Sequence, residues 1–360
     1  MQRRTFLAGA AGAATGLAAA SHLPKPAIAQ ERIEWTMVTP WPKGSPGVGV
    51  NAQRAADMIT QLSGGRLTVN LFAAGELVPP FEAFDAVSNG NADCLHGTPY
   101  YWVGKSASFN WFTGIPFGLL TTEFMGWIYF GDGQALWDEA YEPFGVKPFY
   151  AGSSGVQAGG WFRREITSLD DMQGLKFRIA GMGGEVMNRL GVQVVLMPPG
   201  EIFTAMDSGV IDAAEWVGPW NDLAFGLHRI AKFYYHPAFH EAGPSLELSV
   251  NRSSYEALPD DLKELVAAVA RANAATAIAD FQFNNAVSVR PLVEENGVQF
   301  RLWPDDVVEA VRTVSAEVVA DVAASEPMAT KVNENYQAFL AQAVEWSRYS
   351  DQAYLAARNG

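Results

Sequence analysis

The sequence predicts an α/β protein of two similar lobes that face each other across a cleft and continue into long C-terminal helices. Apolar, β-branched stretches alternate with helical stretches over the first two thirds of the chain, as sheets covered by helices require. A segment of the first half also recurs in the second half. Ligands of such sheets bind beyond the carboxyl ends of the strands, so two facing lobes predict a binding cleft between them.

An internal repeat aligns residues 77–93 with residues 196–212, which lie 119 positions later, and eight of the 17 aligned positions are identical. In each copy a Pro pair ends an apolar run, and an acid, Glu82 or Glu201, favours the positive start of the helix that follows. A glycine then stops that helix before the next strand. One repeat at this separation predicts two similar halves and not a solenoid.

Each half is expected to run strand, helix, strand, preceded by a further strand and helix. In the first half we expect strands over residues 33–39, 67–72 and 92–96, and helices over 48–62 and between 82 and 90. In the second half the expected strands are 176–179, 192–197 and 211–215, with helices over 185–190 and between 201 and 209.

Beyond residue 240 the pattern changes. We expect a strand over residues 246–251 that returns to the first half, and one long Ala-rich helix over 262–283. A further strand is expected over 298–303. Past Pro327 apolar residues recur at helical spacing and mark a face that either packs on its own subunit or is exchanged with a second copy. These residues are Val332, Tyr336, Phe339, Leu340, Ala343 and Trp346.

The first 29 residues are typical of an export signal, with Arg3-Arg4-Thr5-Phe6-Leu7, an apolar Ala/Gly stretch and Ala27-Ile28-Ala29 before the cleavage point. The Arg pair resembles a twin-arginine signal, which predicts a periplasmic protein. An uncleaved membrane anchor is disfavoured because the apolar run is short and interrupted. The expected organisation is a signal peptide over 1–29, lobe I over 30–155 plus about 242–285, lobe II over 156–241 plus about 286–328, and a C-terminal helical segment over 329–360 that is a candidate for dimer formation.

Composition narrows the class of protein. The chain has 360 residues, of which 49% are hydrophobic and 18% charged, as is typical of a globular protein with a large core. Three of its 25 basic residues lie in the leader, so 22 basic side chains face 39 acidic ones from residue 30 onward. This acidic balance argues against nucleic acid as a partner. The single cysteine, Cys94, excludes an intramolecular disulfide and a multi-cysteine metal cluster.

Two loops are expected to line the cleft, because each follows the strand that ends one copy of the repeat. Residues 96–102 and 215–221 are rich in aromatic side chains and poor in charges, as is typical of small-molecule pockets. The sequence contains no nucleophile elbow, zinc-protease helix, P-loop or dinucleotide fingerprint. It therefore predicts binding and not catalysis.

Arg178 is the candidate for recognising an anion. It lies in the expected strand over 176–179, where alternation puts Lys176 and Arg178 on the same side. A guanidinium near a cleft offers a planar pair of donors that matches a carboxylate. An ion pair with one of the surplus acids is the alternative, and spacing alone weighs the two interpretations equally.

Glu215 is the candidate for holding a cation. It follows two alanines at the end of a strand, and no Lys or Arg lies within ten positions on either side. Glu241 and Glu247 flank the returning strand in a similar setting. Such carboxylates repel an organic anion unless a hard cation lies between them, since that cation takes carboxylate, amide and carbonyl oxygens.

Three segments together resemble the substrate-binding subunit of tripartite ATP-independent periplasmic (TRAP) transporters. They are Gly174-Leu175-Lys176-Phe177-Arg178, Pro-Pro-Gly-Glu-Ile-Phe-Thr-Ala over 198–205, and Gly-Val-Ile-Asp-Ala-Ala-Glu-Trp over 209–216. The resemblance covers nearly all of the mature chain, and the Ala-Ala-Glu-Trp ending is similar to the subgroup that binds α-keto acids such as pyruvate or hydroxy acids such as lactate. It implies a type II-like clamshell that hands a small 2-oxo or 2-hydroxy acid to TRAP membrane subunits without chemical turnover.

The resemblance also implies roles for individual residues. In this family an arginine at the position of Arg178 forms a salt bridge with the substrate carboxylate, and in the keto-acid subgroup a metal ion contacts the ligand. The implied metal ligands are Gln157, Glu215, the backbone carbonyl of Trp216, and Glu241, and the implied substrate contacts are Arg178, Gln157, Tyr100, Tyr101 and Trp220.

The sequence leaves alternatives open for the identity of the cation and for the class of protein. Two glutamates, one arginine and a monoanion leave a net charge of −1 with sodium and zero with calcium, so formal charge leaves both open. The resemblance favours sodium, because the family's transporters are sodium-driven. An ABC-type anion-binding protein and a metalloenzyme exported by the twin-arginine route are the alternatives to a TRAP binding protein.

Overall fold

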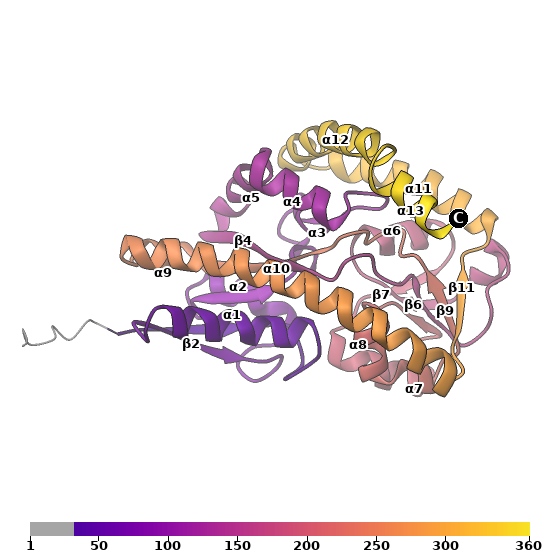
Figure 1. The fold of residues 1–360 in the computed structure, drawn as a ribbon, viewed down its shortest axis with the longest axis horizontal. Coiled ribbons are helices and arrows are strands. Elements are labelled where there is room, and N and C mark those ends of the chain that lie inside the picture. Colours follow the sequence, from indigo (N-terminus) through magenta and orange to yellow (C-terminus); the bar gives the residue numbers. More distant parts are fainter. Residues whose placement is uncertain (1–31) are drawn as a thin grey trace, which may run out of the picture.

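The computed structural model describes residues 32–360 and gathers the strands into two separate sheets (Figure 1). The expected leader over 1–29 lies outside the described residues. The first sheet has the order β2-β1-β3-β10-β4, formed by β1 (Ile33–Val38), β2 (Leu67–Phe72), β3 (Cys94–Gly97), β4 (Val146–Ser153) and β10 (Ser245–Asn251). The second has the order β11-β9-β5-β8-β6-β7, formed by β5 (Gly160–Phe162), β6 (Lys176–Arg178), β7 (Gln193–Val195), β8 (Ala213–Ala214), β9 (Phe233–His236) and β11 (Gln299–Leu302).

Both sheets are mixed, with parallel and antiparallel strand pairs. In each sheet three strands around the repeat are parallel, since β1 pairs with β2 and β3, and β6 pairs with β7 and β8. However, β10 runs antiparallel to β3 and β4, and β5 runs antiparallel to β8 and β9. The chain crosses between the sheets at residues 154–159 and again at 237–244. After each crossing the next strand, β5 or β10, enters its sheet antiparallel to its neighbours.

The sequence repeat forms the same structure twice. A three-residue 3₁₀ turn that starts with proline leads into a six-residue helix in each copy: η2 (Pro80–Glu82) and α2 (Ala83–Ser88) in the first, η6 (Pro199–Glu201) and α7 (Ile202–Asp207) in the second. The repeated glycines follow these helices with φ of 73° and 76°, in the left-handed region that glycine tolerates best.

The repeated aspartates explain the last identity of the repeat. The side chain of Asp93 accepts a hydrogen bond of 2.8 Å from the backbone N–H of Thr36 in β1. The side chain of Asp212 accepts one of 2.9 Å from the backbone N–H of Lys176 in β6. Each aspartate therefore binds the middle one of the three parallel strands in its own sheet, at the corresponding place.

Helices cover both sheets and join them. Helix α1 (Val48–Leu62) has the predicted bounds, and α6 (Gly181–Arg189) begins four residues before the predicted start because its glycine-rich first turn carries no apolar pattern. Helix α10 (Asp260–Arg290) extends beyond the predicted range at both ends and, at about 46 Å, runs along both lobes (Figure 1). It packs on β4 and α1 at one end and on α8 (Pro219–Phe225) at the other.

The C-terminal helices lie along the top of the molecule in Figure 1, whereas α10 crosses its middle. Helix α11 (Asp305–Ala324) packs on α6, whereas α12 (Pro327–Ser347) packs on α3 (Phe109–Thr113), α4 (Thr121–Phe130) and α5 (Gly133–Tyr141). Tyr336 of α12 is buried, and its hydroxyl oxygen accepts a 2.8 Å hydrogen bond from the backbone N–H of Leu119. The terminal α13 (Asp351–Asn359) touches α12 and buries none of its residues. Among the helices of residues 32–360, none combines the length and apolarity needed to cross a membrane.

Candidate ligand and cation site

The two loops predicted to line the cleft meet the two crossing segments at one small cavity between the sheets. Its volume is about 20 Å³. The loop after β3 contributes Thr98 and two tyrosines, and the loop after β8 contributes Trp216. The full lining is Trp41, Val48, Thr98, Tyr100, Tyr101, Ser154, Gln157, Trp216, Val217, Pro244, Ser245 and Leu246.

Arg178 ends β6 and is completely buried. Its Nη1 donates hydrogen bonds to the backbone oxygen of Glu215, at 2.6 Å, and to the Oε2 of the same residue, at 3.0 Å. Within the described residues, Nε and Nη2 of Arg178 are buried and have no hydrogen-bond partner. The ion pair weighed as an alternative therefore exists, yet it leaves half of the guanidinium unsatisfied, and an anionic oxygen is the partner that half requires.

Glu215 lies beside Arg178 because β8 and β6 are neighbouring parallel strands, and Glu241 comes from the second crossing segment. His240 lies between the two, with its Nε2 at 4.0 Å from Oε2 of Glu215 and 3.9 Å from Oε1 of Glu241. All three side chains are buried. Within residues 32–360, Oε1 of Glu215, both carboxylate oxygens of Glu241 and both ring nitrogens of His240 have no hydrogen-bond partner.

Burial controls the ionisation of this cluster. It raises the pKa of Glu215 and of Glu241 above their usual range, and for Glu215 the neighbouring Glu241 adds to the effect while Arg178 opposes it. Burial, reinforced by Arg178, lowers the pKa of His240 to about 3, so this imidazole is neutral. Two carboxyl groups thus share one guanidinium in a dry setting, which costs free energy unless a further cation is present.

The donor set fits a metal ion. One ligand atom each from Glu215, His240 and Glu241 lies within 4.8 Å of the others, and the unpaired carboxylate oxygens point to a shared partner. Carboxylate oxygens are the ligands that sodium and calcium prefer, and a bound cation offsets the repulsion between the two glutamates. The residues present therefore fit the cation implied by the sequence.

Gln157 joins this cluster through the backbone of the crossing segments. Its N–H donates to the backbone oxygen of Glu241 at 3.2 Å, and its side-chain amide donates to Ser154 Oγ at 2.8 Å. Among the described residues its Oε1 is buried and finds no donor. This carbonyl oxygen is available to a cation or to a bound hydroxyl group.

The aromatic side chains predicted for the site divide into two groups. Tyr100, Tyr101 and Trp216 line the cavity, and the Trp216 ring lies 5.6 Å from the guanidinium carbon of Arg178. By contrast, Trp220 in α8 packs edge-on against Phe281 of α10, with ring centroids 5.6 Å apart, and is not part of the lining. Its position in the helix after the loop turns it toward α10 instead of the cleft.

Two further charged residues singled out in the sequence lie elsewhere. Lys176 is exposed, because it begins β6 at the end away from the cleft, although it shares the alternation of Arg178. Glu247 is buried in β10 and accepts hydrogen bonds from Trp102 Nε1 at 2.6 Å and from the hydroxyl of Tyr141 at 2.9 Å. Its oxygens are satisfied inside the first lobe, so it is a structural residue.

Sequence reasoning missed His240 and Trp41. His240 has the two glutamates as spatial neighbours, and only its adjacency to Glu241 in the chain could have drawn attention to it. Trp41 follows β1, lines the cavity, and lies 6.3 Å from the ring of Trp216 in the other lobe. Its own loop carries no repeat signal, since the equivalent loop after β6 leads directly into α6.

The lobes touch each other around the cavity. The ring of Tyr100 lies where a Cβ on Gly181, at the start of α6, would be only 3.3 Å away. On the other side, Nδ2 of Asn221 donates a 2.7 Å hydrogen bond to the backbone oxygen of Pro46. These contacts describe a closed clamshell with the polar cluster sealed inside.

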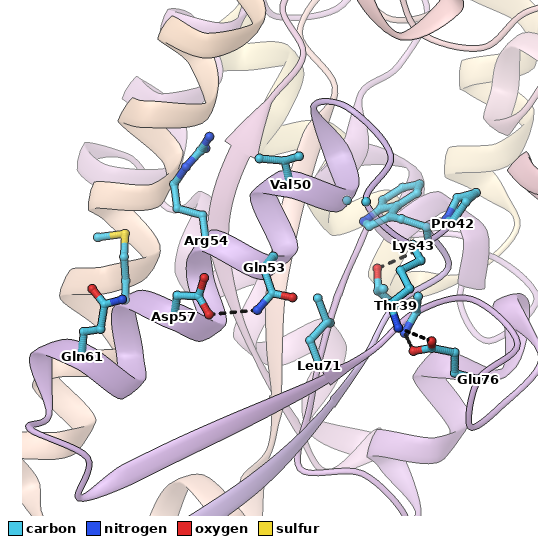
Figure 2. Close-up of a pocket in the computed structure, with 15 residues that line it drawn as sticks. Thr39, Pro42, Lys43, Val50, Gln53, Arg54, Asp57, Gln61, Leu71 and Glu76 are labelled. Atoms are coloured by element: carbon cyan, nitrogen blue, oxygen red, sulfur yellow. Dashed lines mark hydrogen bonds and ion pairs between the residues drawn. The ribbon is translucent and has the colours of Figure 1, made fainter. Parts of the chain in front are cut away.

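A larger cavity of about 650 Å³ lies beside α1 in the first lobe and shares Trp41 with the small cavity (Figure 2). Gln53 and Asp57 of α1 form one wall and are hydrogen-bonded to each other, and Lys43 pairs with Glu76 at the opposite side. These polar groups already have partners, and this hollow is an open surface feature. The small cavity, whose lining residue Trp216 lies next to the buried guanidinium of Arg178, is the better candidate for the ligand.

Comparison with known proteins identifies the class of this fold. The profile of the bacterial extracellular solute-binding proteins, family 7 (DctP), matches residues 37–326. The chain belongs to this family. Family 7 proteins bind solutes, and this membership sets binding above the enzymatic alternative considered for the sequence.

Three relatives sharpen the comparison. The chain is 38% identical over 323 residues to a monocarboxylate 2-oxoacid-binding periplasmic protein of Nostoc sp., covering 89% of this chain and 88% of that protein. It is 34% identical to a TRAP periplasmic solute-binding protein of Pseudoalteromonas atlantica solved with sodium and pyruvate, with a TM-score of 0.87 and coverage of 91% and 99%. It is 32% identical to a TRAP solute-binding protein of Bordetella bronchiseptica, with a TM-score of 0.88 and coverage of 92% and 100%. That structure is a dimer with copurified calcium and picolinate in one active site and the other site empty.

Proposed function

We propose that this family 7 protein binds a small 2-oxo monocarboxylate such as pyruvate together with a cation, and delivers it to TRAP membrane subunits. The observation that carries the proposal is the sealed cluster of buried, unpaired polar atoms on Arg178, Glu215 and Glu241. Such atoms cost free energy when they lack partners, so the fold keeps them for a ligand.

The charges of the site residues indicate which residue binds which part of the ligand. The free Nε and Nη2 of Arg178 form a fork for the carboxylate of the acid. The glutamates hold the cation, and the 2-oxo group completes its coordination with Gln157 Oε1 and the backbone carbonyl of Trp216. Tyr100 and Tyr101 close over the acid from the first lobe. The sodium-and-pyruvate and calcium-and-picolinate relatives support this assignment, because both acids pair a carboxylate with an adjacent donor atom.

Thermal unfolding tests this function. Adding pyruvate to wild-type protein with sodium or calcium present is expected to raise the melting temperature, because the ligand binds only the folded state. Arg178→Gln is expected to remove that shift. Arg189→Gln, which changes an exposed arginine paired with Glu185 and Asp321, is the matched control and keeps the shift. A wild-type protein that shows no shift with any short oxo or hydroxy acid contradicts the proposal.

Sodium is the cation we propose under working conditions, on the ground that the family's transporters are sodium-driven, with calcium as the alternative. Equilibrium dialysis of metal-stripped protein with pyruvate separates the two ions. Half-saturation by calcium at micromolar concentration, in a large excess of sodium, overturns the sodium assignment but leaves the pyruvate site in place.

We propose further that the chain works in the periplasm after loss of residues 1–29. Fractionation of cells that make the full-length chain tests this, with Arg3→Lys and Arg4→Lys together as the variant. Export of the wild type and retention of the variant inside the cell support a twin-arginine route. Equal export of both contradicts it.

A homodimer formed through the C-terminal segment is the proposed assembly. Helix α13 buries none of its residues, and Trp346 and Tyr349 just before it are 68% and 78% exposed. The Bordetella relative is a dimer. Tyr336 and Asn333 of α12 form hydrogen bonds with the first lobe, so a truncated chain must keep them and end at residue 347. Sedimentation as a dimer for the full chain and as a monomer for the truncated chain is the expected result, and equal sedimentation contradicts it.

A further inference from the structure

We propose that the imidazole of His240 supplies a nitrogen ligand to the cation held by Glu215 and Glu241. The inference rests on the proposed function and adds a third protein side chain to the cation's ligands. It makes the site one of mixed nitrogen and oxygen donors.

The distances around His240 suit a shared ion better than a hydrogen bond. Its Nε2 lies at nearly the same distance, 4.0 Å and 3.9 Å, from one oxygen of Glu215 and one of Glu241. Both separations are too long for a hydrogen bond. Donor atoms that share an ion stand about 3–4.5 Å apart, because each lies about 2.0–2.6 Å from the metal.

The ring of His240 is held in this place by its surroundings. A Cβ on Gly183 of α6 would approach the side chain of His240 to 2.6–2.9 Å, so the absence of a side chain there makes room for the histidine. The ring centroid of Phe239 lies 5.1 Å from that of His240. The backbone oxygen of Glu241, the next residue, accepts from Gln157 and fixes the crossing segment.

The nitrogens of His240 also lack any other use in the described part of the chain. Both are buried, and neither has a hydrogen-bond partner. A buried imidazole normally satisfies at least one of its nitrogens. The contrast is His96 in β3, whose two ring nitrogens lie 3.0 Å from Trp41 Nε1 and 3.1 Å from Asn51 Nδ2.

A nitrogen donor changes which ions the site prefers. Imidazole binds first-row transition ions more strongly than calcium or sodium, whereas carboxylates alone serve the hard ions. The chain is therefore expected to bind Mn²⁺ at this site, in competition with calcium, and to do so through His240.

Pulsed electron paramagnetic resonance of the Mn²⁺-loaded, pyruvate-loaded protein tests the ligand directly. The wild type is expected to show the modulation of a directly coordinated ¹⁴N nucleus. His240→Gln and His240→Ala are expected to lose it, and Gly183→Ala, which intrudes on the ring, to weaken it. His228→Gln is the matched control, because this histidine lies near the end of α8, outside the cluster, and its replacement leaves the signal unchanged.

Equilibrium dialysis adds a second readout. His240→Gln is expected to lower the affinity for Mn²⁺ at least about tenfold and the affinity for calcium less, while circular dichroism and the melting temperature of the metal-free protein stay near wild type. Mn²⁺ that binds the wild type with pyruvate but shows no nitrogen coupling, or coupling that survives both His240 variants, overturns the role of His240 and leaves the proposed function intact. Failure of the wild type to bind any cation or pyruvate overturns both.

Discussion

The second lobe contains two kinds of buried carboxylate: Asp222, whose oxygens have hydrogen-bond donors, and Glu215 and Glu241, which keep oxygens without a donor among the described residues. Asp222 in α8 accepts from Trp161 Nε1 at 2.8 Å, from the Tyr234 hydroxyl at 2.6 Å and from two backbone N–H groups at 3.2 Å. Glu215 and Glu241, by contrast, retain three oxygens that have no partner in residues 32–360.

The first lobe repeats the satisfied arrangement. Glu247 accepts from a tryptophan indole and a tyrosine hydroxyl, as Asp222 does in the second lobe, and from the hydroxyl of Ser249 at 2.5 Å. The tryptophan held by Glu247 is Trp102, next to the cavity residue Tyr101. The two satisfied acids therefore hold neighbouring aromatic side chains in place, and the two unsatisfied acids are the ones that we propose to face the ligand. Buried charge alone does not mark function, but buried charge without partners does.

The largest expected effect comes from the guanidinium. Arg178→Gln removes both the fork for the acid and the charge that opposes the two glutamates. We expect a loss of about 2–5 kcal/mol in pyruvate binding, or at least about 30-fold in affinity, measured by calorimetry with the cation present. Circular dichroism of the variant checks that the fold survives. Pyruvate affinity within threefold of wild type would remove Arg178 from the site.

Glu215→Gln is the sharpest test of the comparison, because it separates stability from binding. The variant is expected to lose cation-dependent pyruvate binding by at least about tenfold. Its free energy of unfolding without ligand is expected to equal or exceed that of wild type, since a poorly satisfied buried charge is removed. Urea unfolding of the ligand-free protein measures this. Marked destabilisation would mean that Glu215 is a structural residue like Asp222.

Asp222→Asn is expected to show the opposite behaviour. Replacing the carboxylate weakens hydrogen bonds from Trp161, Tyr234 and two backbone groups, so the free energy of unfolding should fall by about 1–3 kcal/mol. Pyruvate affinity at a temperature where the variant is folded should change less than in Glu215→Gln. A variant as stable as wild type by urea unfolding would contradict the assignment of Asp222 as a structural anchor.

Much of this design was readable in the sequence. The repeat predicted two matching βα units. Arg178 and Glu215 were separate candidates at the ends of two predicted strands, and the pairing of β6 with β8 brings them together. The resemblance supplied Gln157 and gave Glu241, already a candidate from its position, the role of a metal ligand. Both residues reach the cluster through the crossing segments. No local pattern indicated these segments, because their pairing joins residues about 80 positions apart in the chain, and long-range pairing leaves no periodic signal. For the same reason His240 was missed. Trp220 was expected at the cleft because it lies in the aromatic loop over 215–221, but helix α8 turns it toward α10.

The smallest effect is the pH dependence of stability from Glu247. Burial raises the pKa of its carboxyl group to about 7 in the folded protein, above the usual value of about 4.5. The folded state therefore holds a proton that the unfolded state releases first, and this contribution to stability falls as the pH rises from about 4.5 to above 7. Glu247→Gln should flatten that part of the curve of unfolding free energy against pH. An unchanged slope would show that Glu247 titrates normally.

The central claim is that one cation and one 2-oxo acid bind together in the unsatisfied cluster, and calorimetry of metal-stripped protein tests it most directly. Pyruvate titrated into wild-type protein without a cation should release little or no heat. The same titration with sodium or calcium supplied should give a 1:1 binding isotherm. Glu215→Gln should give neither isotherm. Pyruvate binding of equal affinity with and without any cation, or no heat in any condition, would contradict the account.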